Sequence, residues 1–255
     1  MINNEFYDEL GDDWTDRSDH PVALLRRENA FRTPWVIREL EERVPNKVAI
    51  LDIGCGAGFL SNPLAEVGHK VTGIDLSQSS LEVAQKRDLT KSVHYLQATA
   101  YSLPFRNQSF DAVCAMDILE HVEEPNLLIA EASRVLKTGG YFFFHTFNRN
   151  PFSYFTVIKS MEWFVKNTPP NLHVYPLFIK PDELNEHLKN YKLQPIHWIG
   201  LAPKIFSRAT LRLLMTGSVP PDFSFRFTRS LLSGYCGIAK KEQYYTQMHS
   251  TRRKP

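Results

Sequence analysis

The segment Leu51-Asp52-Ile53-Gly54-Cys55-Gly56-Ala57-Gly58 decides which fold this chain can adopt. It closes an apolar run, 48–53, that predicts a buried parallel strand. Its glycines allow a tight turn whose backbone can approach a ligand, and 59–67 then has a helical pattern. A second predicted strand, 70–74, is followed by Asp75. A carboxylate about 20 residues past a glycine turn can accept both hydroxyls of a ribose. The segment therefore predicts a site for an adenosine-type ligand.

The glycine spacing and the charge beside it narrow the choice of ligand. Gly54, Gly56 and Gly58 alternate with other residues, and Asp52 stands two positions before the first of them. A carboxylate at this strand end repels the pyrophosphate of a dinucleotide, whereas it tolerates the ammonium and sulfonium of S-adenosylmethionine. We therefore expect S-adenosylmethionine as the cofactor, with Asp75 on its ribose. The alternative is a generic strand-to-helix turn with incidental glycines.

Composition is that of an ordinary globular protein. The chain has 255 residues, of which 43% are hydrophobic and 23% charged. Its formal net charge of +2 gives no footprint of a nucleic-acid binder, so no nucleic acid partner is expected. It has no apolar signal segment and no run of 18 apolar residues, which predicts a cytoplasmic location. The three cysteines lack paired spacing, which argues against a zinc site or a disulfide framework: Cys55, Cys114 and Cys236.

Alternating strand and helix signals predict an α/β fold with a doubly wound, mostly parallel sheet. The expected strands lie near 48–53, 70–75, 93–97, 110–115 and 141–147. Two more helices are expected at 127–136 and 181–190, the first ended by 137–140, and 235–239 is a candidate edge strand. We expect one domain over 1–245, divided into a helical cap (1–45), a cofactor-binding core (46–149), an inserted lid or membrane-interface segment (150–180) and the C-terminal part of the sheet (181–245), followed by a basic tail (246–255).

Several segments together resemble a known family. The glycine turn, Asp75, 110–113 and 136–140 are similar to the class I S-adenosylmethionine-dependent methyltransferases. A narrower set resembles the ubiquinone-biosynthesis O-methyltransferases, which methylate polyprenylated catechols and hydroquinones: Tyr95-Leu96-Gln97-Ala98-Thr99, Met116-Asp117-Ile118-Leu119-Glu120-His121-Val122, Thr146-Phe147-Asn148-Arg149 and Phe178-Ile179-Lys180-Pro181-Asp182-Glu183-Leu184. The resemblance fades after Gly200.

The resemblance implies a Rossmann-like sheet of seven strands and a set of cofactor residues. Arg32 matches an arginine of the family that can pair with the cofactor carboxylate; the alternative is a solvated helix arginine. Thr99 stands where many class I members have Asp, and the quinone subgroup often has Thr there. With the residues of the glycine turn, the expected cofactor site comprises Arg32, Asp52, Gly54, Gly56, Gly58, Asp75, Thr99 and Met116.

Methyl transfer to a phenol needs a group that deals with the phenolic proton, because the pKa of a phenol is about 10. Asp117, Glu120 and His121 have the spacing of one helical face. His121, with Glu120, is the expected base. The same three residues are a candidate Mg²⁺ site, since relatives of the family carry an acid-x-x-Glu-His set thought to bind a divalent cation. The alternative is a capping box that opens a helix. Other candidate histidines are His145, His173 and His187.

The segment 152–166 is rich in aromatic residues. Phe152, Phe155, Ile158, Met161 and Val165 recur at helical spacing and predict an amphipathic helix. Such a helix lies in a membrane interface or covers an apolar acceptor; the alternative is a helix packed on the core. Because this region of the quinone family is implicated in membrane contact, we expect peripheral contact with an anionic membrane, on its inner face.

These observations predict an S-adenosylmethionine-dependent O-methyltransferase that acts on a polyprenylated catechol or demethylubiquinol in ubiquinone biosynthesis. The expected partner is a lipid-like phenol or quinol, and the sequence gives no oligomeric state. One alternative is a methyltransferase for another small hydroxylated aromatic or for a quinone ring carbon. The other is a non-catalytic scaffold that binds the cofactor.

Overall fold

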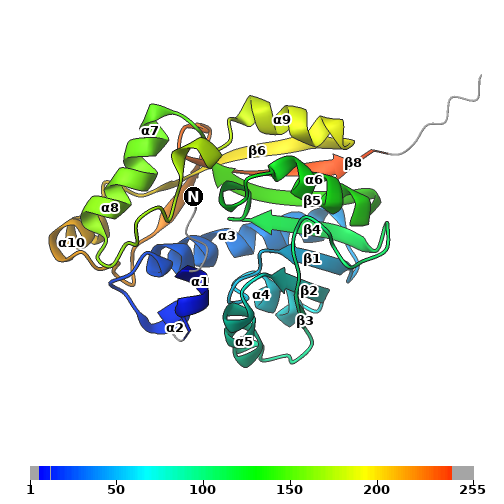
Figure 1. Ribbon diagram of the computed structural model, residues 1–255, viewed down its shortest axis with the longest axis horizontal. Helices are drawn as coiled ribbons and strands as arrows, with labels where there is room; N and C mark the ends of the chain where they lie inside the picture. The colour runs from blue at the N-terminus through cyan, green and yellow to red at the C-terminus, as the bar shows by residue number, and fades with distance from the viewer. Residues whose placement is uncertain (1–5, 12, 243–255) are drawn as a thin grey trace, which may run out of the picture.

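The computed structural model describes residues 6–11 and 13–242 (Figure 1). The predicted basic tail, 246–255, lies outside the described residues. Eight strands of the described chain form one sheet in the order β3-β2-β1-β4-β5-β8-β6-β7. Their bounds are β1 Ala49–Ile53, β2 Lys70–Asp75, β3 His94–Gln97, β4 Phe110–Met116, β5 Leu136–Phe147, β6 Leu193–Pro203, β7 Phe225–Thr228 and β8 Gly234–Lys241. The α/β prediction is confirmed, and the predicted count of seven strands is corrected to eight.

The sheet changes direction at β5. The pairs from β3 to β5 are parallel, whereas β5·β8, β8·β6 and β6·β7 are antiparallel. The prediction of an edge strand at 235–239 is wrong, because β8 lies between β5 and β6. Its side chains Tyr235, Cys236, Ile238 and Ala239 are fully buried on both faces, which is typical of an interior strand. Residues 137–140, predicted from the sequence to end a helix, are instead part of β5, where the pairing with β4 shifts register.

Helices cover both faces of the sheet. Neighbouring residues of a strand point to opposite faces, so each strand contributes side chains to two cores. Ile50 packs with Leu40 and Leu64 from α3 (Val22–Arg43) and α4 (Ser61–Glu66). Its neighbour Leu51 packs in the opposite core with Leu128. That core is covered by α6 (Pro125–Val135) and α9 (Pro181–Asn190), and the remaining helices of this part are α1 (Phe6–Glu9), α2 (Asp13–Asp16) and α5 (Gln78–Arg87). The helix predicted for 181–190 is confirmed, and the one predicted for 59–67 is shorter than expected.

The inserted segment is helical but irregular. It comprises α7 (Pro151–Ser153), the π-helical η2 (Tyr154–Lys159), α8 (Ser160–Phe164) and the later turn η3 (Tyr175–Leu177). Figure 1 places α7 and α8 at the same end of the molecule as α10 (Arg208–Thr216), a helix that the sequence analysis missed. The predicted single apolar stripe is wrong. Ile158, Met161 and Val165 are buried, whereas Phe152 and Phe155 are exposed. The reason is the π-helical turn, whose i→i+5 bonding shifts later residues to another face.

Candidate active site

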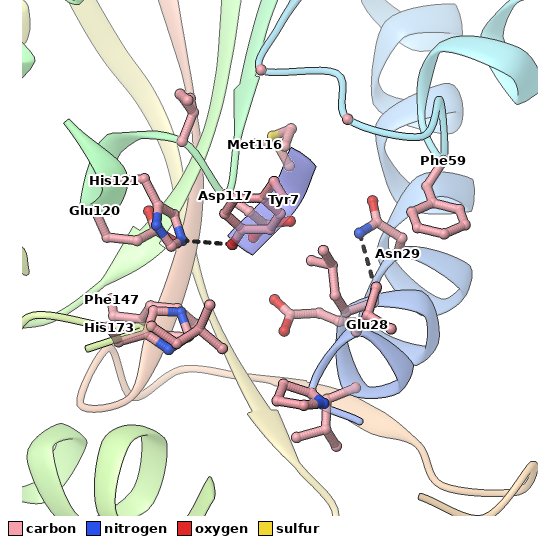
Figure 2. A pocket seen from close by; sticks show the side chains of 18 of the residues that line it. Tyr7, Glu28, Asn29, Phe59, Met116, Asp117, Glu120, His121, Phe147 and His173 are labelled. Carbon is pink, nitrogen blue, oxygen red and sulfur yellow. Dashed lines mark hydrogen bonds between the residues drawn. The ribbon is translucent and has the colours of Figure 1, made fainter. Parts of the chain in front are cut away.

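A cavity of about 850 Å³ opens at the carboxyl ends of β1, β2 and β4 (Figure 2). This is the edge where open α/β sheets bind ligands. Its walls come from α1, α3, the glycine turn, the segment after β4, and the helices α8 and α10. Every Asp, Glu, Lys or Arg among the described lining residues is acidic: Asp8, Glu28, Asp52, Asp75, Asp117, Glu120 and Glu123. The cavity therefore favours a ligand that carries positive charge.

The glycine turn fixes the position of Asp75. Gly54 and Gly56 have φ of 71° and 49°, a left-handed conformation that favours glycine. A Cβ on Gly54 would lie 2.8 Å from Ile118 Cδ1, so a side chain there would collide. The Gly56 amide donates to Asp75 Oδ2 at 2.8 Å, and the Ser77 amide donates to Oδ1 at 2.9 Å. Burial raises the pKa of Asp75. These contacts hold the carboxylate against the cavity.

The other predicted cofactor residues divide into those that line the cavity and one that does not. Asp52, Thr99 and Met116 line the cavity together with Asp75. Asp52 accepts a hydrogen bond from Ser61 Oγ at 2.6 Å, and burial raises the pKa of its carboxyl to about 7. Gly58 is not among the described lining residues. A Cβ there would lie 2.4 Å from the hydroxyl of Tyr95, so Gly58 is required for packing.

Arg32 lies behind the cavity wall in a buried cluster of charged groups. Its side chain is 1% exposed, and it donates from Nη1 to Asp117 Oδ1 at 2.7 Å and from Nη2 to Oδ2. His145 Nδ1 contacts the same Asp117 carboxylate, and Glu28 Oε1 lies 3.2 Å from Arg32 and 3.3 Å from His145. The four side chains form a closed ring. In this ring Arg32 is paired with the carboxylate of Asp117. The sequence resemblance predicts instead that Arg32 pairs with the carboxylate of the cofactor.

Charge pairing outweighs burial in this ring. Burial by itself would raise the pKa of Asp117, but Arg32 and His145 hold it well below its usual range. Burial would lower the pKa of His145, and the nearby carboxylates of Asp117 and Glu28 raise it instead. Asp117 is therefore ionised at neutral pH and is committed to the ring.

The predicted shared helical face of Asp117, Glu120 and His121 is wrong. The helix after β4 is a single 3₁₀ turn, η1 (Leu119–His121), which begins after Asp117. Asp117 has a φ of 62°, and this left-handed backbone turns its side chain toward Arg32. The alternative of a capping box is not observed either, because η1 has no side-chain cap.

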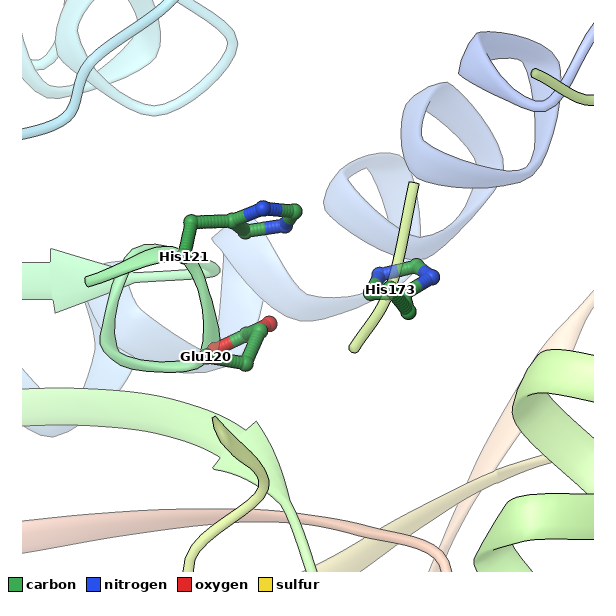
Figure 3. A group of neighbouring side chains, drawn as sticks. All are labelled: Glu120, His121 and His173. Atoms are coloured by element: carbon green, nitrogen blue, oxygen red, sulfur yellow. The ribbon is translucent and has the colours of Figure 1, made fainter. Parts of the chain in front are cut away.

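His173, and not Asp117, is the third side chain beside Glu120 and His121. Figure 3 shows Glu120, His121 and His173 pointing into a common space, and one ligand atom from each lies within 4.8 Å of the others. Among the described residues, the Glu120 carboxylate oxygens have no hydrogen-bond partner. Burial and the charge of Asp117 raise the pKa of Glu120 to about 7. Burial lowers the pKa of His121 to about 4 and that of His173 to about 3. Both imidazoles are therefore neutral near pH 7.

Two further parts of the cavity were missed by the sequence analysis. Tyr7, on α1, points to His121 in Figure 2, with its hydroxyl 3.4 Å from Nε2. No sequence pattern marks this tyrosine. The helix α10, which forms another part of the wall, could have been predicted from the sequence. Ser207 caps its start, and Gly217 ends it in a left-handed conformation. Of the other candidate histidines, His187 is on α9 and is not among the described residues lining the cavity.

Comparisons with known proteins show which family the chain belongs to. A family described as methyltransferase domain matches residues 51–144. A curated ubiquinone biosynthesis O-methyltransferase from Pseudomonas putida is 37% identical over 199 residues, which cover 76% of this chain and 84% of the relative.

Solved structures show the same fold at low sequence identity. An S-adenosylmethionine-dependent methyltransferase from Thermotoga maritima, described as a possible histamine N-methyltransferase, has a TM-score of 0.63 and 18% identity, covering 93% of this chain and 99% of its own. Magnesium protoporphyrin IX methyltransferase from Synechocystis, solved with bound S-adenosylhomocysteine, has a TM-score of 0.59 and 15% identity, covering 95% and 89%. The chain therefore belongs to the ubiquinone biosynthesis O-methyltransferases and is an S-adenosylmethionine-dependent O-methyltransferase of class I fold.

Proposed function

We propose that this enzyme methylates a ring hydroxyl of a polyprenylated catechol or demethylubiquinol. The observation that carries the proposal is the continuity of one cavity. It joins the glycine turn and Asp75 to the Glu120–His121 pair and then to a wall of apolar side chains from α8 and α10. A polar aromatic ring with an apolar substituent fits a cavity whose lining changes from polar to apolar in this order. The name of the Pseudomonas relatives supports the same substrate class.

Glu120 and His121 are the residues proposed to receive the phenolic proton. A base works best when its pKa lies near the working pH. The Glu120 carboxyl, with a pKa of about 7, meets this condition better than His121, with a pKa of about 4. His121 is neutral and can accept a hydrogen bond from the acceptor hydroxyl. Methyl transfer is an in-line displacement at the sulfonium, so the remaining task of the site is to hold the oxygen against the methyl group.

We propose that the cofactor ribose binds Asp75 and that its adenine ring lies against Thr99 and Met116, all of which line the cavity. The charged side chains that line the cavity, within the part of the chain that the structure describes, are all acidic, which suits a sulfonium and an ammonium. Arg32 stays the candidate partner for the cofactor carboxylate. To make that contact it would have to share its guanidinium between Asp117 and the ligand.

The proposed Mg²⁺ site does not fit the residues that the structure brings together. Glu120, His121 and His173 offer two imidazoles and one carboxylate, whereas Mg²⁺ prefers oxygen ligands and retained waters. Imidazole donors suit zinc or iron better. We therefore assign no step of the reaction to Mg²⁺. Activity measured after chelator treatment, with and without added Mg²⁺, tests this point: unchanged activity agrees with proton transfer by side chains, and full dependence on Mg²⁺ contradicts it.

A membrane surface is proposed as a second partner, because α8 and α10 expose apolar side chains beside basic ones. The exposed apolar side chains near this end are Phe152, Phe155, Trp163, Phe164, Ile205, Phe206, Leu211, Leu214 and Met215. Lys204 and Arg208 are exposed next to them, where they would attract anionic headgroups. No helix in the described part of the chain is long and apolar enough to cross a bilayer, so this contact would be peripheral, at the inner face of the membrane.

One experiment separates this function from its alternatives. The protein is incubated with methyl-labelled S-adenosylmethionine and a catechol that carries a short isoprenoid chain, and the product is analysed by mass spectrometry. A methyl ether supports the proposed function. A methyl on the ring carbon supports C-transfer, and cofactor binding without turnover supports a scaffold.

A further inference from the structure

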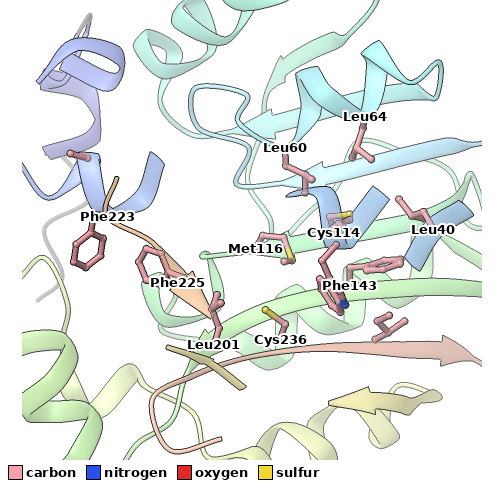
Figure 4. Packing of buried hydrophobic residues seen from close by; sticks show 14 of the residues in the cluster. Leu40, Leu60, Leu64, Cys114, Met116, Phe143, Leu201, Phe223, Phe225 and Cys236 are labelled. Carbon is pink, nitrogen blue, oxygen red and sulfur yellow. The ribbon is translucent and has the colours of Figure 1, made fainter. Parts of the chain in front are cut away.

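The cavity has a second arm that the chemistry of methyl transfer does not require. From Met116 at the end of β4, apolar side chains continue outward between the inserted helices and the strands β6 and β7. Figure 4 shows part of this series, with Leu201, Phe223 and Phe225 lying beyond Met116. The lining of the arm comprises Thr156, Val157, Ser160, Met161, Phe164, Val165, Leu172, Leu201, Pro203, Ile205, Thr210, Leu213, Leu214, Phe223 and Phe225. None of these described lining residues is charged.

The two ends of the cavity therefore differ in chemistry. At the end formed by α1, α3, the glycine turn and η1, the described lining residues include seven with carboxyl groups, which suit a charged and hydrogen-bonding ligand. In the arm, Val165 from the inserted segment and Leu213 from α10 are both buried and line the cavity. Water gains few hydrogen bonds beside such side chains, so an apolar ligand group is favoured there.

The arm leads to the surface through apolar residues. Ile205 is 53% exposed and Leu214 is 47% exposed, and both also line the cavity. Phe164 likewise lines the cavity and is partly open to solvent. A flexible chain attached to a ring at η1 can therefore run through the arm and leave at an apolar rim.

We propose that the arm between α8 and α10 binds the apolar chain of the acceptor, and that Val165 and Leu213 limit how much of that chain fits. This inference rests on the proposed function, and it assigns one wall of a binding site to a part of the chain where the family resemblance has faded, after Gly200. The occupant is an isoprenoid chain attached to the reacting ring. The argument for it is that the arm is continuous with the reaction site and has no charged lining.

The test measures kcat/KM for catechols that carry no, one, two or three isoprene units, in the absence of lipid. The full-length protein is used, with S-adenosylmethionine at saturation. We expect wild-type kcat/KM to rise roughly tenfold or more with the first unit, because even the lower limit for burying an apolar group of this size corresponds to about a tenfold gain in affinity. Most of the gain should appear in KM.

Two variants fill the arm from two different segments of the chain, Leu213→Phe and Val165→Phe. Each is expected to remove most of the gain from the chain while the tail-free catechol keeps kcat/KM within about threefold of wild type. Leu127→Phe is the matched control, since Leu127 is exposed on α6 and is not among the lining residues. It should keep the full gain. Thermal unfolding of each variant checks that it is folded.

The outcomes separate the two proposals. Transfer to the tail-free catechol with no gain from added units contradicts the chain site and leaves the proposed function intact. A gain that survives in both folded filling variants also contradicts the chain site. Absence of transfer to every catechol contradicts the proposed function itself.

Discussion

Replacing Asp117 by Asn should destabilise the fold strongly, because Asp117 is the carboxylate that balances Arg32. The Arg32 side chain is 1% exposed, so the guanidinium cannot turn to water when its partner loses charge. Breaking a buried pair by removing one partner typically costs about 3–5 kcal/mol. Glu28 remains at 3.2 Å from Arg32 and offsets part of the loss, which places the expected value near the lower limit, about 3 kcal/mol. Urea unfolding followed by tryptophan fluorescence measures it.

The stabilisation that Asp117 contributes should depend on pH. The folded pKa of Asp117 lies below its unfolded value, so its contribution is complete above about pH 4 and is lost as the pH falls further. The difference in unfolding free energy between wild type and Asp117→Asn should therefore shrink in acid. Asp222→Asn is the matched control, because its ion pair with Arg212 has both side chains more than half exposed, and it should leave stability close to that of wild type. An Asp117→Asn protein within about 1 kcal/mol of wild type at pH 7 would refute the ring as a stabilising unit.

Three more predictions address the site and the surface. Asp75→Ala should weaken S-adenosylmethionine binding by about 1–3 kcal/mol, since the ribose hydroxyls lose a charged acceptor; calorimetry with unchanged affinity in a folded variant contradicts the ribose assignment. Glu120→Gln and His121→Ala should each lower turnover about 10²–10⁴-fold with little change in cofactor affinity, and a variant at full speed removes that residue from proton transfer. The double variant Phe155→Ser, Trp163→Ser should pellet less with anionic vesicles than wild type, because both side chains are exposed on the inserted helices; equal pelleting, or no pelleting of wild type, contradicts membrane docking.

The parallel half of the fold was predictable because its signals are local. The strands β1 and β4 contain short apolar runs, and the alternating glycines mark the position of the turn. Asp75 follows from its distance to that turn. The family comparison carried the same information, since its match covers residues 51–144.

The errors arose where tertiary contacts override local spacing. The i, i+3, i+4 pattern of Asp117, Glu120 and His121 predicts one helical face. In the structure Asp117 has a left-handed backbone before the helix begins, and its carboxylate pairs with Arg32 and His145. Sequence spacing contains no sign of a partner 85 residues away in the chain. His173 was a candidate by residue type alone, because it reaches Glu120 only through the folding of the inserted segment.

The interior position of β8 could not be predicted for a related reason. Its sequence, Gly234–Lys241, is a short apolar run that fits an edge or an interior strand equally well. The choice is made by β6, which pairs with β8 on the side away from β5.

Locating the transferred methyl group distinguishes an O-methyltransferase from every alternative in one measurement. Wild-type protein is incubated with methyl-labelled S-adenosylmethionine and a catechol bearing one isoprenoid chain, and the product is examined by mass spectrometry and NMR. We expect a labelled methyl ether on one ring hydroxyl, formed at a rate that falls sharply in Glu120→Gln. Label on a ring carbon, or no labelled product from a protein that binds the cofactor, would contradict it.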